Sequence, residues 1–147
     1  MSEVLLVGID CSECSERALD YAADRVAANG RGLIVAHVIQ WSPFSFQTPQ
    51  ENEERHKQRE AELARAHGEI VDPVVNRLRE RGLNVQGVIR HGHPAETLCA
   101  VATEFGATHI VVGKTGSSRI RAQLFGSVAH ALVQISKCPV TVVPGKK

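Results

Sequence analysis

The stretch Ile110-Val111-Val112-Gly113-Lys114-Thr115-Gly116-Ser117-Ser118 places a Gly- and Ser-rich turn directly after a short apolar run. A polar spacer follows, and Phe125-Gly126-Ser127-Val128 then opens a helical pattern. Glycine lets the backbone approach a ligand closely, and exposed N–H groups at a turn and at a helix N-terminus favour anions. Tight turns alone would also use glycines, but a Gly-rich loop joined to a helix start favours a phosphate site. The residues that would form it are Gly113, Gly116, Gly126, Ser127 and Val128.

Outward from this stretch, apolar runs alternate with helix-period segments five times. That pattern is typical of an α/β fold in which helices cover both faces of a parallel sheet. The predicted strands are residues 4–9, 32–39, 84–89, 109–113 and 139–143. The longest helical pattern runs from about Asn52 to Arg81, and Pro73 is expected to bend or break it because proline lacks a backbone N–H. The length fits a single domain over residues 1–147.

Composition and charge narrow the classes of partner. The 17 Lys and Arg residues nearly balance the 16 Asp and Glu residues, and the net charge is +1. No global field therefore directs the chain to nucleic acid or to anionic lipid, and any anion site must be local. The apolar run 4–9 is too short for a secretory signal, and no segment approaches the roughly 18 apolar residues of a membrane span. The expectation is a cytoplasmic protein without a nucleic-acid or membrane partner.

The spacing Gly-x2-Gly-x9-Gly-Ser resembles the nucleotide-binding signature of the universal stress protein family, in the subgroup that binds ATP. The resemblance extends along nearly the whole chain, and the order and spacing of its motifs together are specific. These motifs are Val7-Gly8-Ile9-Asp10-Cys11-Ser12-Glu13, Ala36-His37-Val38, His91-Gly92-His93-Pro94-Ala95 and Lys137-Cys138-Pro139-Val140-Thr141-Val142-Val143. The resemblance implies an open five-stranded sheet in the order 3-2-1-4-5, which is Rossmann-like and similar to the adenine nucleotide alpha hydrolases.

The same resemblance implies roles for further residues. In an open parallel sheet, ligands bind beyond the carboxyl ends of the strands, where the strand order reverses. Ile9 and Val38 would flank adenine or bond to it through backbone groups, and Val112 would pack against the nucleoside. Asp10 would lie near the base and ribose or help to hold a phosphate-bound metal, and it also fits an N-cap of the first helix. Thr115 offers a hydroxyl to the ligand. The implied cofactor is ATP, with or without Mg²⁺.

Other sites are excluded or left open. A Walker A motif would need glycine at position 108, which is Thr108. No nucleophile elbow is present, and no base is placed by the sequence to activate water, so no catalytic residue is predicted. His91 and His93 form a pair without the further ligands that structural zinc needs, so no metal site is predicted. The predicted function is a nucleotide-dependent regulatory and stress-response module that binds ATP and changes its contacts with an unidentified protein partner. A slow ATP hydrolase, an autophosphorylating protein and a nucleotide-free dimeric interaction protein are the alternatives.

Two segments keep more than one interpretation. Cys11 and Cys14 form a Cys-x2-Cys pair where the first helix begins, which suits either a redox pair or an ordinary turn of small residues. The loop 41–50 carries Trp41 and two phenylalanines, and it covers either the nucleotide site or a second subunit.

The C-terminal run 138–143 is apolar and is expected at an edge of the sheet. An unpaired edge invites another strand, although Pro139 and Pro144 limit how far such pairing extends. Members of the family pair these last strands antiparallel, so the resemblance implies a homodimer.

Overall fold

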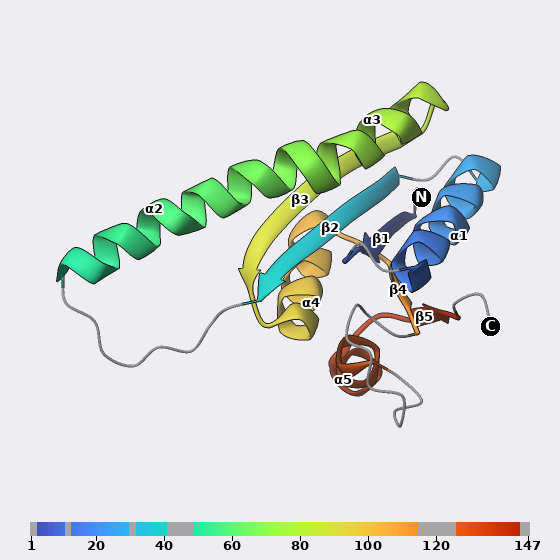
Figure 1. Cartoon of the computed structure of the whole chain (residues 1–147). Coiled ribbons are helices and arrows are strands. Elements are labelled where there is room, and N and C mark those ends of the chain that lie inside the picture. Colours follow the sequence, from blue (N-terminus) through green and yellow to red (C-terminus); the bar gives the residue numbers. More distant parts are fainter. Residues whose placement is uncertain (1–2, 11–12, 30–31, 41–48, 115–125, 145–147) are drawn as a thin grey trace.

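The computed structural model describes residues 3–10, 13–29, 32–40, 49–114 and 126–144. Five strands form one parallel sheet in the order β3-β2-β1-β4-β5 (Figure 1). The strands are β1 (Val4–Gly8), β2 (Gly32–Gln40), β3 (Asn84–Gly92), β4 (His109–Gly113) and β5 (Val140–Val143). The predicted α/β class and the order 3-2-1-4-5 are confirmed.

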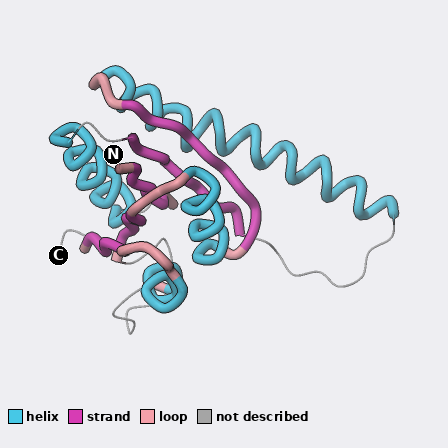
Figure 2. Tube along the Cα trace, turned by 180° about the vertical axis from the view of Figure 1, so that it is seen from behind, coloured by secondary structure: helices cyan, strands magenta, loops and turns pink. Residues whose placement is uncertain are grey.

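Helices cover both faces of the sheet, and each face has its own core. On one face, α1 (Glu13–Asn29) and α3 (Asp72–Glu80) bury Leu19, Val26 and Leu78 against the strands. On the other face, α4 (Pro94–Phe105) and α5 (Ser127–Ile135) bury Leu98 and Leu132. Seen from behind, α4 lies in front of the strands (Figure 2). Both faces are apolar, which explains why the central strands β1 and β4 are near-continuous apolar runs in the sequence.

The strand ends differ by a few residues from the prediction. β1 stops at Gly8. The Ile9 N–H still donates to β2, but the Asp10 N–H donates to Ser15 Oγ at 3.0 Å. β2 and β3 continue to Gln40 and Gly92 because the two strands pair along their whole length. Such pairing depends on the neighbouring strand, and the sequence of one strand does not reveal it.

The long helical pattern is interrupted just before Pro73. It forms α2 (Pro49–Ala66), a π-helical turn η1 (His67–Val71) and α3. The Asp72 N–H donates to the His67 carbonyl, five residues back, and Pro73 follows as an early residue of α3. The wide turn fits a proline that has no N–H and whose ring would clash in a regular helix. The predicted interruption is therefore confirmed, in the form of a π-turn.

The polar part of α2 extends past the carboxyl ends of β2 and β3 (Figure 1). The side chains from residue 53 to residue 61 are exposed, except for a partly buried Arg55, as expected for a solvated helix surface. Among the described residues, no helix is both long and apolar enough to cross a bilayer.

Candidate functional site

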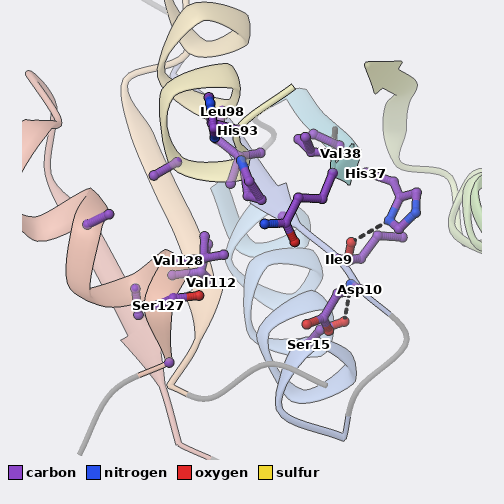
Figure 3. A pocket seen from close by; sticks show the side chains of 18 of the residues that line it. Ile9, Asp10, Ser15, His37, Val38, His93, Leu98, Val112, Ser127 and Val128 are labelled. Atoms are coloured by element: carbon purple, nitrogen blue, oxygen red, sulfur yellow. Dashed lines mark hydrogen bonds between the residues drawn. The ribbon is translucent and has the colours of Figure 1, made fainter. Parts of the chain in front are cut away.

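A cleft of about 820 Å³ opens at the carboxyl ends of β1, β2 and β4 (Figure 3). Its size suits a small organic ligand. Gly8 forms part of its lining, and a Cβ on Gly8 would lie 3.1 Å from Leu98 Cδ1 and 3.3 Å from Val112 Cγ1. The bare glycine thus lets α4 and β4 approach the end of β1 closely.

The cleft lies where the strand order reverses. β1 pairs with β2 up to Gly8↔Ala36, but its pairing with β4 ends one step earlier, at Val7↔Val111. The chain leaves β1 for α1 on one face, and it returns from β4 to α5 on the other. A crevice at such a point is the usual ligand site of an open parallel sheet.

The start of α5 forms one wall of the cleft. Gly126 is the N-cap residue, with φ −65° and ψ 163°, and its carbonyl accepts the His130 N–H at 3.0 Å. The first amides inside a helix have no intrahelical acceptor, and no described residue outside the helix accepts those of Ser127 and Val128. The positive end of the helix dipole adds to their attraction for an anion.

A hydrogen bond joins this wall directly to the segment after β4. The Gly126 N–H donates to the Lys114 carbonyl at 2.7 Å, and the Lys114 N–H donates to the Val143 carbonyl at 2.7 Å. The expectation that Gly126 offers its own amide to a ligand is therefore wrong, because Lys114 already accepts it. Gly126 instead contributes its extended conformation and its lack of a side chain.

The opposite end of the cleft is built from the ends of β1 and β2. The Ile9 N–H donates to the Ala36 carbonyl at 2.9 Å, and the Ile9 carbonyl lies 2.8 Å from His37 Nδ1. Both backbone groups of Ile9 thus have partners, which favours the flanking role over the hydrogen-bonding role. Val38 lines the same end, beside Gln40.

Asp10 lines the cleft next to Ser15 (Figure 3). The Ser15 hydroxyl accepts the Asp10 N–H, and the Ser15 residue is only 4% exposed. This bond ties Asp10, which follows β1, to the first turn of α1 and so fixes where the Asp10 side chain begins.

The structure brings most of the predicted site residues together. Those that line the cleft are Ile9, Asp10, Val38, Val112, Gly113, Gly126, Ser127 and Val128. Thr115 and Gly116 lie outside the described residues. The cleft is also lined by residues that were not predicted as site residues: His37, Gln40, the α4 N-cap residue His93 and Glu96 of the first turn of α4. A polar residue inside an apolar strand was the available signal for His37.

The cysteines lie apart from this cleft or outside the described part of the chain. Cys11 and the side chain of Cys14 lie outside the described part of the chain. Cys99 and Cys138 are free and partly buried. Burial raises the pKa of the Cys99 thiol, and the nearby Cys138 raises it further. A raised pKa lowers the thiolate fraction, so Cys99 is a poor nucleophile at neutral pH.

The two histidines considered as metal ligands have separate surroundings. His91 Nε2 lies 3.4 Å from Glu62 Oε2 and links β3 to α2, whereas His93 is the N-cap residue of α4. Within the described ranges, no group of three or more His, Cys, Asp or Glu side chains is arranged to hold a metal ion.

Comparison with known proteins identifies the family of this chain. Residues 1–144 match the model of the universal stress protein family. The chain belongs to the universal stress protein family. It is 28% identical to the universal stress protein YxiE of Bacillus subtilis (strain 168), over 97% of this chain and 99% of that protein.

Solved structures share the fold of this universal stress protein. The protein MJ0577 is 25% identical with a TM-score of 0.83, and the match covers 100% of this chain and 99% of that one. A universal stress protein solved in complex with cAMP is 27% identical with a TM-score of 0.69, over 99% of this chain and 98% of that one.

Proposed function

We propose that this universal stress protein binds ATP in the cleft and acts as a regulatory module whose contacts with partners depend on nucleotide occupancy. One observation carries the proposal: the start of α5 and the end of β4 line the same cleft as the ends of β1 and β2. Amides suited to phosphate thus lie across one hollow from strand ends suited to a base. The cAMP complex of a relative supports an adenine nucleotide as the ligand class.

In the proposed arrangement, the phosphates lie against the Ser127 and Val128 amides and the base lies against Val38. Val112 packs on the nucleoside, and Asp10 faces the ribose or a phosphate-bound Mg²⁺, an ion that prefers oxygen ligands and keeps several waters. Thr115 and Gly116 lie outside the described residues, and only the glycine motif assigns them to the phosphates. The choice of ATP over a monophosphate rests on the glycine signature, which resembles that of the ATP-binding subgroup of the family.

Adding Mg-ATP is expected to raise the melting temperature of the protein. A ligand at about a hundred times its Kd stabilises the folded state by about 2.7 kcal/mol. For a domain of this size, that corresponds to about 5–10 °C. Differential scanning fluorimetry with ATP, ADP, cAMP and inorganic triphosphate measures the shift and ranks the ligands. A flat response to every adenine nucleotide at millimolar concentration would contradict the proposal.

We also propose that the protein forms a homodimer through β5. β5 is an edge strand, and its pairing with β4 fixes which of its peptide groups face outward. The Pro139 and Val143 carbonyls accept from Ile110 and Lys114 of the β4 segment. Because alternate residues of a strand face opposite neighbours, the groups of Val140 and Val142 point away from β4 toward a second chain.

Val142→Pro is expected to convert the dimer to a monomer. The substitution removes an outward N–H but none of the amides that pair with β4, and proline is tolerated on edge strands. Val142→Ala is the matched control, since it shortens the side chain and keeps the N–H. Light scattering at micromolar concentration reads out the mass. A Val142→Pro protein with an unchanged dimer mass would show that β5 is not the interface.

A further inference from the structure

His37 makes an unusual link between the ends of β1 and β2. Its Nδ1 lies 2.8 Å from the Ile9 carbonyl oxygen (Figure 3). A carbonyl only accepts hydrogen bonds, so the ring nitrogen is the donor, and neutral His37 must carry its hydrogen on Nδ1. The side chain thus occupies an acceptor that a backbone amide would ordinarily use.

The parallel ladder identifies the amide that is replaced. The Ala36 carbonyl accepts the Ile9 N–H, so the peptide groups of Ala36 face β1. Alternate residues of a strand face the same neighbour, so those of Val38 face the same side. In a continued ladder, the next bond would run from the Val38 N–H to the Ile9 carbonyl. Among the described residues no such bond forms, and His37 takes its place.

We propose that His37 is a positioning residue for the base: by satisfying the Ile9 carbonyl, it keeps the Val38 peptide edge open toward the cleft. This inference rests on the proposed nucleotide function. It gives His37 a positioning role in which the side chain neither contacts phosphate nor takes part in a reaction. Without His37, the Val38 N–H would extend the ladder by one bond, because a buried carbonyl without a donor is unfavourable. The end of β2 would then lose its free donor.

Among the described residues, no backbone partner takes the edge of Val38 that faces β1. This edge, which the family resemblance assigns to adenine, also predicts which base fits. It presents one N–H donor and one C=O acceptor on the same side of the strand. The Watson–Crick edge of adenine offers an acceptor at N1 beside a donor at N6, which matches both groups. Guanine offers a donor at N1 beside an acceptor at O6, which opposes both. A site whose buried polar groups pair with one ligand discriminates strongly against a second ligand that leaves those groups unpaired.

The first experiment needs no nucleotide. Amide hydrogen exchange by NMR on the ligand-free protein should show Val38 exchanging at least about tenfold faster than Ile9, whose N–H donates within the sheet. In His37→Leu, which has no donor, Val38 exchange should slow at least about tenfold. In His37→Asn, which keeps an N–H at the Nδ1 position, it should stay fast. Equal protection of Val38 and Ile9 in the unaltered protein would overturn the inference even if His37→Leu failed to fold.

The second experiment measures base preference. In His37→Leu, ATP affinity should fall about tenfold, the effect of one lost net hydrogen bond, whereas affinity for inorganic triphosphate should not change. The preference for ATP over GTP should fall together with the ATP affinity. His37→Asn should restore both the affinity and the preference. An unchanged preference in His37→Leu would contradict the positioning role. Absence of ATP binding by the unaltered protein would instead contradict the proposed function, and the exchange result would still decide the role of His37.

Discussion

Ser127→Pro is expected to weaken ATP binding by about 10- to 100-fold while leaving the free energy of unfolding nearly unchanged. Ser127 is the first residue of α5, where a backbone N–H has no intrahelical acceptor and proline is readily accommodated. The residue before a proline favours an extended backbone, and Gly126 already has ψ 163°. The substitution thus removes one ligand donor without an obvious structural cost. A hydrogen bond to a charged group contributes about 1.5–3 kcal/mol, which sets the expected loss.

Ser127→Ala separates the amide from the hydroxyl. It removes the Ser127 side-chain oxygen and keeps the N–H, so its effect on ATP affinity should be clearly smaller. Isothermal titration with ATP and with inorganic triphosphate measures both variants, and urea unfolding monitors stability. If Ser127→Pro bound ATP as tightly as the unaltered protein, the phosphates would not lie at the start of α5.

The sheet could be predicted because its strands are short apolar runs bounded by turn residues. The central runs, such as Ile110-Val111-Val112, are buried on both faces, and this leaves a clear pattern in the sequence. The strand order came from resemblance to a family, since no local pattern states which strands are neighbours. The start of α5 was also predictable, because Gly126 and Ser127 sit where a helical pattern begins.

The parts of the site that could not be predicted depend on contacts between distant segments. The bond from Gly126 to Lys114 closes a loop whose ends are twelve positions apart in the chain, and it removes a donor that the motif alone would count. His37 likewise acts on the carbonyl of Ile9, which belongs to another strand. A motif names which residues gather at a site, but hydrogen-bond partners decide which of their polar groups remain available.

Gly87→Ala should destabilise the protein by about 1–3 kcal/mol, the usual cost of inserting a methyl group into a filled core. Gly87 lies in β3 beneath the π-turn, and a Cβ there would overlap Val71 Cγ1 and lie 3.1 Å from Val75 Cγ2. Val71 and Val75 are both buried, so neither side chain has room to move aside. Gly68→Ala is the matched control: Gly68 lies in the same turn with nothing within 4 Å of an added Cβ, and alanine there should stabilise by about 0.4–1 kcal/mol.

A double-mutant cycle tests the cause of this loss. Val71→Ala alone should destabilise by leaving a cavity, but together with Gly87→Ala the new methyl group should fill part of that space. The double variant should therefore be more stable than the sum of the single effects by about 0.5–3 kcal/mol, the range for residues in contact. Urea unfolding of the four proteins gives the coupling energy. Additive effects would mean that Gly87 is required for something other than the close approach of the π-turn to β3.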